Sequence, residues 1–180
     1  FVEILSATLA AVTAWHFGFT AAGVAAIVLT WLLIALAFID IDHQLLPDVM
    51  VLPFLWAGLL LNLSNVFTTL PHAVIGAVAG YLSLWLVFHL FKLITGKEGM
   101  GYGDFKLFAL FGAWLGWQSL PLIILLSSFM GALIGIGLIV FQGRDRARPL
   151  PFGPYLAAAG WVAMLWGDEI MRQYLQLARI

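Results

Sequence analysis

Two short stretches of the 180-residue chain carry residues able to do acid–base chemistry. The first, AFIDIDHQLLPDVM, contains Asp40, Asp42 and Asp48, and the second, GYGDFKL, contains Asp104. Two carboxyls held close together do not ionise together easily, so one keeps its proton while the other acts as a base. Such a pair can activate water against a peptide carbonyl and protonate the carbonyl oxygen. This aspartic chemistry needs no thiol, and the chain contains no cysteine.

The composition defines the solvent around these acids. Hydrophobic residues make up 63% of the chain and charged residues 9%, against roughly 25% charged in soluble domains, and the mean hydropathy is +1.05. A soluble protein of this size would cover its surface with many more charges. The net charge of −1 and the absence of a lysine-rich stripe exclude a nucleic-acid partner. The sequence therefore predicts a polytopic membrane protein whose surroundings are lipid.

The apolar runs predict an all-α transmembrane helix bundle of about seven spans. A span needs about 20 mostly apolar residues, and helices satisfy every backbone group within lipid. The first, third, fifth and seventh runs are short for a full span. The predicted helices are Val2–Trp15, Ala21–Ile39, Val49–Leu63, Ala73–Phe91, Phe105–Trp117, Leu120–Phe141 and Pro154–Trp166.

Basic residues orient the bundle. Connections after the first, third and fifth predicted helices contain no Lys or Arg. The positive-inside rule therefore places the basic side in the cytoplasm, and Asp40 and Asp104 lie at that edge of the membrane. Two intervening helices allow these acids to meet. The basic residues in or beside the other three connections are Lys92, Lys97, Lys106, Arg144, Arg146 and Arg148.

Glycines recur at two kinds of place. Gly99, Gly101 and Gly103 alternate before Asp104, so the backbone there can adopt positive φ and lie close against another backbone without a Cβ clash. Both a strip for an extended substrate and a flexible turn fit this spacing. GAVAG (residues 76–80) and GALIGIG (131–137) place glycines four apart, as in closely packed membrane helices, and we expect packing within one subunit rather than a dimer interface.

The two acidic stretches together resemble the type IV prepilin peptidases, which are membrane aspartic proteases with a Gly-x-Gly-Asp motif. The resemblance extends through residues 96–118 and through RPLPFGPYLAAAGW (148–161), so it covers nearly the whole chain. It implies one transmembrane peptidase domain over residues 1–180, with Asp40 and Asp104 as the catalytic pair. PFGP (151–154) resembles a segment of the family, but its role does not follow from the sequence.

Asp42 is a rival for the first catalytic position. Asp40 is preferred because related enzymes carry an acid six positions before a Leu/Ile-Pro pair, here Leu46-Pro47. Asp42 then either supports the site or is solvated, and Asp48 is expected to cap the third helix. Lys106 either holds a nearby carboxylate ionised or extends to the membrane interface. The residues expected to bind substrate or support the catalytic pair are Asp42, Pro47, Asp48, Gly101, Gly103 and Lys106.

The resemblance implies removal of a short basic leader from type IV prepilins and type II secretion pseudopilins, after a glycine, on the cytoplasmic side of the bacterial inner membrane. Proteolysis needs no cofactor, whereas family enzymes commonly also methylate the new N-terminus with S-adenosylmethionine. In those enzymes a further span and a cysteine-bearing, metal-binding region precede the part that this chain resembles, and we expect the chain to be the peptidase core of a longer enzyme.

Two other interpretations compete with this one. A proton-coupled transporter could use the same acids as a relay, but its charges would lie near the middle of the bilayer within repeated halves. A metal site would need three or four converging ligands. The four histidines, His16, His43, His72 and His89, fall on different sides of the predicted membrane, so no metal site is expected.

Overall fold

The computed structural model describes residues 1–96, 100–142 and 151–177, and this part of the chain contains helices and no strands. Lys97, Gly99, Arg144, Arg146 and Arg148, on which part of the predicted orientation and glycine strip depends, lie outside the described residues. The helices are α1 Val2–Phe17, α2 Ala21–His43, α3 Asp48–Leu61, α4 Leu70–Thr95, α5 Tyr102–Leu115, α6 Leu120–Gln142 and α7 Gly153–Leu177, with short 3₁₀ turns at Asn62–Ser64 and Trp117–Ser119.

The predicted all-α class and the seven helices are confirmed, but the lengths of the helices differ. Three segments are long and apolar enough to cross a membrane, namely Ala21–His43, Leu70–Thr95 and Trp117–Leu138. Helices α1 and α3 are apolar but shorter. Helix α5 has 14 residues, about 21 Å of helix, which is less than the roughly 30 Å hydrocarbon core. The chain is thus a membrane protein, with three candidate spans among the seven α-helices of its described residues.

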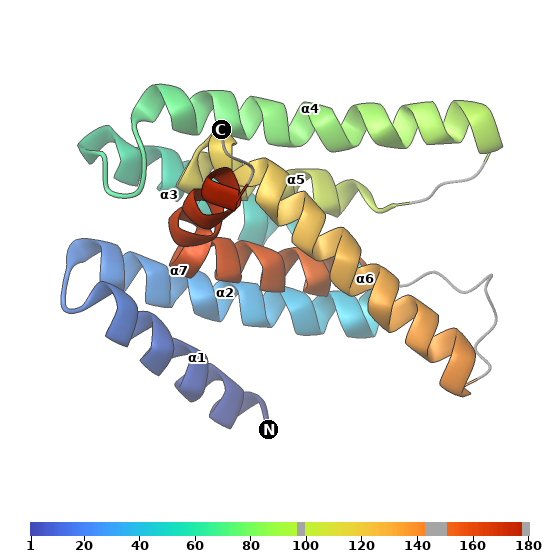
Figure 1. Ribbon diagram of the computed structural model, residues 1–180, viewed down its shortest axis with the longest axis horizontal. Coiled ribbons are helices and arrows are strands. Elements are labelled where there is room, and N and C mark those ends of the chain that lie inside the picture. Colours follow the sequence, from blue (N-terminus) through green and yellow to red (C-terminus); the bar gives the residue numbers. More distant parts are fainter. Residues whose placement is uncertain (97–99, 143–150, 178–180) are drawn as a thin grey trace.

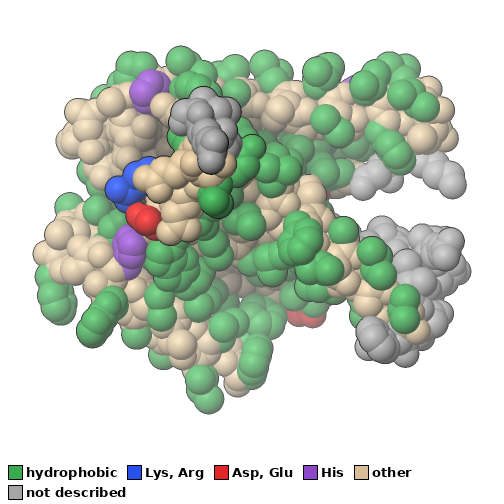
Figure 2. Space-filling model, viewed as in Figure 1, with side chains coloured by type: hydrophobic (Ala, Val, Ile, Leu, Met, Phe, Trp, Pro, Cys, Tyr) green, Lys and Arg blue, Asp and Glu red, His purple; other side chains and the backbone are tan. Residues whose placement is uncertain are grey.

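Helix α5 forms the centre of the bundle. It contacts α3, α4, α6 and α7, and nearly every residue from Asp104 to Trp114 is buried. In Figure 1, α4 runs along one edge of the molecule and α1 and α2 along the opposite edge, with α5 and α7 between them and α6 crossing in front. Hydrophobic side chains are spread over the face seen in Figure 2, where few charged side chains are visible, as expected for a lipid-facing surface.

Glycines allow α4 and α5 to touch. A Cβ atom added at Gly76 would overlap the Gly112 carbonyl oxygen, and one added at Gly80 would lie 2.8 Å from the Phe108 carbonyl oxygen. The GAVAG stretch therefore packs α4 on α5 within one chain, as predicted. In the second stretch, a Cβ at Gly131 would meet Tyr155 of α7 at 3.4 Å, while a Cβ at Gly137 would have no neighbour within 4 Å.

A buried asparagine holds the far end of α5. The Asn62 side chain is fully buried and donates to the carbonyl oxygens of Ala113 and Trp114, each at 2.9 Å. Its own oxygen accepts from the N–H groups of Phe67 and Thr68. Because the last carbonyls of a helix lack partners within that helix, these bonds satisfy the end of α5 and fix it against the α3–α4 connection.

Candidate active site

Asp40 lies in the last turn of α2, on the buried side of the helix. Its relative exposure is 6%, whereas Asp42 is exposed to solvent. Two residues along a helix rotate by about 200°, so these two acids face nearly opposite directions. The helix ends at His43, and Gln44 adopts the left-handed conformation that turns the chain toward α3. Of the two rival acids, therefore, Asp40 faces the protein interior.

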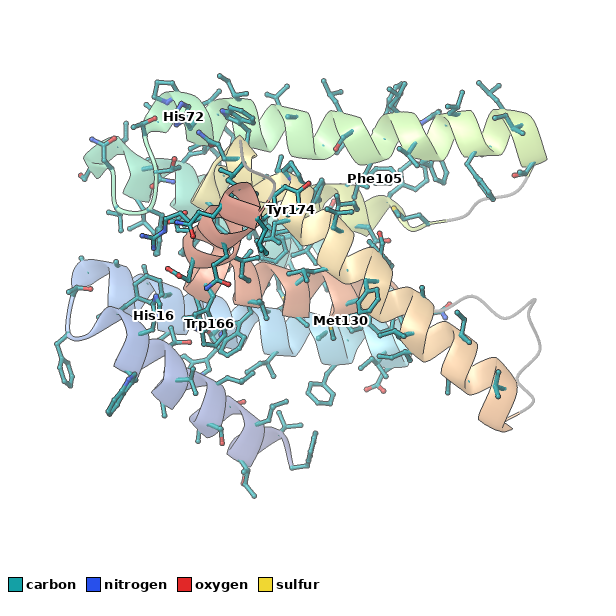
Figure 3. The ribbon with its side chains drawn as sticks, viewed as in Figure 1. His16, His72, Phe105, Met130, Trp166 and Tyr174 are labelled. Atoms are coloured by element: carbon teal, nitrogen blue, oxygen red, sulfur yellow. The ribbon has the colours of Figure 1, made fainter. Side chains whose placement is uncertain are left out.

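Asp104 lies in the first turn of α5 and is 5% exposed. Its Oδ2 atom accepts a hydrogen bond from the N–H of Gly101 at 3.2 Å, and its own N–H donates to the Gly101 carbonyl oxygen. This reciprocal pair caps the helix and fixes the carboxyl. The next residue, Phe105, packs against the aromatic rings of Tyr81 and Phe88 of α4, and Figure 3 shows it between the two helices.

The two buried carboxyls interact. Burial raises the pKa of Asp104 to about 7, with the negative charge of Asp40 adding to the rise and the hydrogen bond from Gly101 opposing it. At neutral pH a substantial fraction of Asp104 therefore carries a proton beside a second carboxyl. One carboxyl can act as the acid and the other as the base when the pKa values of the two neighbouring groups differ. The arrangement is suited to activating water against a carbonyl group.

The start of α7 forms the third wall of the site. Gly153, the first residue of that helix, donates its backbone N–H to the Oδ2 atom of Asp40 at 3.0 Å. The sequence interpretation did not assign this glycine to the site. The signal available was the PFGP segment, in which Pro151 and Pro154 flank Phe152 and Gly153. Three elements distant in sequence, α2, α5 and α7, thus meet at the two acids.

Gly101 and Gly103 do not use the positive φ that glycine allows. Gly101 has φ −80°, and Gly103 lies within α5. Gly99 lies outside the described residues. The expected close approach is found at Gly103, where an added Cβ would lie 2.7 Å from the Cβ atom of Leu46. Gly103 therefore lets the α2–α3 connection rest directly on the start of α5.

Lys106 and Asp48 form an ion pair. The Lys106 Nζ atom lies 2.6 and 2.7 Å from the two oxygens of the Asp48 carboxylate. Lys106 therefore binds a carboxylate, as one of its two predicted roles required, and that carboxylate belongs to Asp48. Pro47, not Asp48, is the N-cap of α3, which corrects the capping prediction. Because the side chain of Asp48 is 54% exposed, the pair contributes modestly to stability, but it ties α3 to the first turns of α5.

The histidines are scattered. His16 packs against Phe17 and Trp166, whereas the ring of His72 lies 3.1 Å from the Gln118 side chain; Figure 3 shows the two histidines on separate helices. Among the described residues, no group of three or more His, Asp or Glu side chains is placed to hold a metal ion.

Comparison with known proteins identifies the family. Residues 27–136, which include both buried acids and end before Gly153, match the type IV leader peptidase family. The chain is 60% identical over 177 residues to the prepilin leader peptidase/N-methyltransferase of Pseudomonas aeruginosa and 51% identical over 175 residues to that of Legionella pneumophila.

These alignments cover 98% and 97% of the chain but only 61% of each relative, so the chain spans about three fifths of their length. No solved structure matches the chain. The matched region is more than half of the chain and contains the two acids that α2 and α5 bring together. The chain therefore belongs to the type IV leader peptidase family.

Proposed function

We propose that this chain is the peptidase part of a membrane enzyme that removes the short basic leader from type IV prepilins and type II secretion pseudopilins, cutting after a glycine. The observation that carries the proposal is the pair of buried carboxyls, Asp40 and Asp104: burial raises the pKa of Asp104 to about 7, and the charge of Asp40 adds to the rise. The names of the relatives supply the substrate class.

In the proposed mechanism, Asp40 begins ionised and Asp104 begins protonated, in keeping with the raised pKa of Asp104. Asp40 takes a proton from water as the water oxygen attacks the scissile carbonyl carbon, and Asp104 donates its proton to the carbonyl oxygen. When the C–N bond breaks, the proton on Asp40 passes to the leaving nitrogen and Asp104 recovers its proton from the hydroxyl that becomes a carbonyl again. Both residues return to their starting states.

The proposed location is the bacterial inner membrane, with all seven helices embedded and the acids at the cytoplasmic edge. Asp40 lies in the last turn of α2 and Asp104 in the first turn of α5, so both acids are at helix ends. Lys92, in the last turn of α4, and Lys106, in α5, are basic residues near the same edge, and basic residues mark the cytoplasmic side. A leader peptide carrying lysines or arginines would be attracted by the exposed acid Asp42, whereas the charge of Asp48 is already paired with that of Lys106.

Methyl transfer belongs to the proposal for the whole enzyme, because the relatives are named leader peptidase and N-methyltransferase. Such an activity would use S-adenosylmethionine as the methyl donor. Gly101 caps α5 and Gly103 lies against Leu46, so these two glycines already serve to pack the start of the helix. No step of methyl transfer is derived from the residues of this chain.

The test is leader cleavage of a purified prepilin in lipid, with the wild type compared with Asp40→Asn, Asp104→Asn and Asp42→Asn. Loss of the acid or the base is expected to lower kcat by about 10³-fold or more. Asp42→Asn distinguishes the two rival acids, because Asp42 lies two residues from Asp40 and is exposed; its kcat should stay within about threefold of wild type, and the loss of a charge that attracts the leader should appear in KM.

The outcomes separate the alternatives. If Asp42→Asn is inactive and Asp40→Asn is active, the first catalytic acid is Asp42. If Asp40→Asn and Asp104→Asn both cleave at the wild-type rate, the aspartic mechanism is wrong, and the acids serve another purpose such as proton relay.

A further inference from the structure

The contact between α7 and Asp40 is the feature of the site that the catalytic pair does not explain. The two residues are 113 positions apart in the sequence, and the N–H of Gly153 donates to the Asp40 Oδ2 atom at 3.0 Å in a buried setting. The first N–H groups of a helix have no partner within that helix. The contact therefore satisfies the start of α7 and at the same time fixes one oxygen of a buried acid.

The space around Gly153 is shaped to the Asp40 carboxyl. A Cβ atom added at Gly153 would lie 2.6 Å from Oδ2, 3.0 Å from Cγ and 3.3 Å from Cβ of Asp40. All three atoms belong to one side chain, whose free end can rotate. A methyl group at position 153 would therefore displace the Asp40 carboxyl more readily than the backbone of α7, so the substitution would change the position of the acid.

We propose that Gly153 is a positioning residue for the cleavage reaction: its N–H holds Oδ2 of Asp40, and its missing side chain lets the carboxyl lie against the start of α7, so that Oδ1 is the oxygen that takes the proton from water. This inference rests on the proposed function, in which Asp40 is the base. The positive end of the α7 dipole also favours a negatively charged partner at this place.

The two acids are then held in the same way. Gly101, at the start of α5, donates its N–H to Oδ2 of Asp104 at 3.2 Å, as Gly153 does to Oδ2 of Asp40. The Gly101 contact joins residues three apart in one helix cap, whereas the Gly153 contact joins two helices. The position of Asp40 therefore depends on how α7 docks on α2, and the two helices are in contact.

The experiment compares three glycine variants of the full-length enzyme in the prepilin cleavage assay. Gly153→Ala should lower kcat by about 100-fold or more with little change in KM, because the base is misplaced while the substrate contacts remain. Gly160 lies on the same helix, and a Cβ atom there would overlap the Phe111 ring, away from the acids. Gly160→Ala should therefore lower the thermal midpoint and have little effect on kcat of the folded enzyme. Gly137→Ala, which has no neighbour within 4 Å, should leave both unchanged.

A second measurement separates positioning from folding. Replacing Gly153 by glycolic acid, through nonsense suppression, turns the backbone N–H into an ester oxygen and adds no side chain. The variant should lose kcat while keeping a thermal midpoint close to that of the wild type. The acid limb of its pH–rate profile should move to higher pH, because a hydrogen bond that favours the ionised carboxyl is gone. A purely structural cap would not move the profile.

The results distinguish this inference from the proposed function. If Asp40→Asn is inactive while Gly153→Ala and the ester both match Gly137→Ala in kcat and in pH profile, the positioning role is overturned and the mechanism stands. If Gly153→Ala loses activity only in proportion to lost folded protein, the role is likewise overturned. If Asp40→Asn cleaves normally, the aspartic mechanism falls and this role falls with it.

Discussion

At the scale of single residues, each buried acid gives one oxygen to a glycine N–H at the start of a helix. Asp104 accepts from Gly101 and Asp40 from Gly153. The two acids come from opposite ends of their own helices, since Asp40 ends α2 and Asp104 begins α5. The two carboxyls share this kind of hydrogen bond, and the pKa of Asp104, raised to about 7 by burial and by the charge of Asp40, suits Asp104 to the acid role.

The pKa of Asp104 leads to a prediction on the pH dependence of cleavage. Asp104 must hold a proton when the reaction starts, and its pKa is about 7. As the pH rises through that value the proton is lost, so kcat should fall by about tenfold per pH unit well above it. Prepilin cleavage measured from pH 5 to 9 checks this; a rate that stays constant between pH 7 and 9 would contradict it.

The same pKa can be checked independently through stability. The ordinary pKa is 3.8, and the folded protein holds the proton up to about pH 7. Between these values the unfolded chain binds fewer protons than the folded one, so the free energy of unfolding decreases as the pH rises from about 4 to about 7. Asp104→Asn cannot ionise, so its thermal midpoint should exceed that of the wild type at pH 8, and the excess should shrink toward pH 4. An excess that is the same at both pH values would show that the pKa is not raised.

At the scale of elements, the short α5 is positioned by what touches its two ends. Asn62 binds the last carbonyls of the helix. At the other end Leu46 rests on Gly103, and the Asp48–Lys106 pair links the start of α3 to the same turns. The α2–α3 connection, which follows Asp40 by only a few residues, is thereby held against the helix that carries Asp104.

The two glycines of the GYGD motif should respond differently to alanine. Gly103→Ala would place a Cβ 2.7 Å from the Cβ of Leu46, whereas Gly101→Ala would add one 3.6 Å from Oδ2 of Asp104, an ordinary contact, at φ −80°. Overpacking of this kind destabilises by about 1–3 kcal/mol, so Gly103→Ala should lower both the thermal midpoint and the cleavage rate more than Gly101→Ala.

Thermal unfolding and prepilin cleavage of the two variants provide the measurement. A double variant, Gly103→Ala with Leu46→Gly, is the control, because glycine at position 46 removes the Cβ atom that the new methyl group would meet. If Gly101→Ala is the more damaging of the two single changes, the contact between Gly103 and Leu46 does not position the helix.

At the scale of the whole molecule, the proposed orientation can be tested by labelling. The chain contains no cysteine, so a single introduced cysteine is the only one that it carries. Leu45→Cys follows α2 and Phe19→Cys precedes it, and both positions are exposed. A membrane-impermeant maleimide should label Leu45→Cys in inverted inner-membrane vesicles and Phe19→Cys in right-side-out ones, since α2 is long enough to separate them.

Labelling of both positions from one side would show that α2 does not cross the membrane. The reverse pattern would keep the span and place Asp40 on the periplasmic side, where the proposed cytoplasmic cleavage could not occur. Either result concerns the whole molecule and leaves the local geometry of the carboxyl pair unchanged.

The membrane setting, the seven helices, the packing role expected of GAVAG and the family all follow from the amino-acid sequence. These features are local, because an apolar run defines a helix in lipid and a motif is read from neighbouring positions. The resemblance also directed attention to Asp40 and Asp104, at the ends of predicted helices. Composition alone does not decide whether all seven helices cross the membrane, since α5 is short and is enclosed by other helices.

The residues that face the two acids are set by how the helices pack. The direction of Asp40 and Asp42 depends on the rotation of α2 in the bundle, and the Asp48–Lys106 pair joins residues 58 positions apart. The contact of Gly153 with Asp40 needs α7 to dock with its first N–H against α2. Helix crossing and rotation are set by the packing of all the helices together, which no short pattern in the chain encodes.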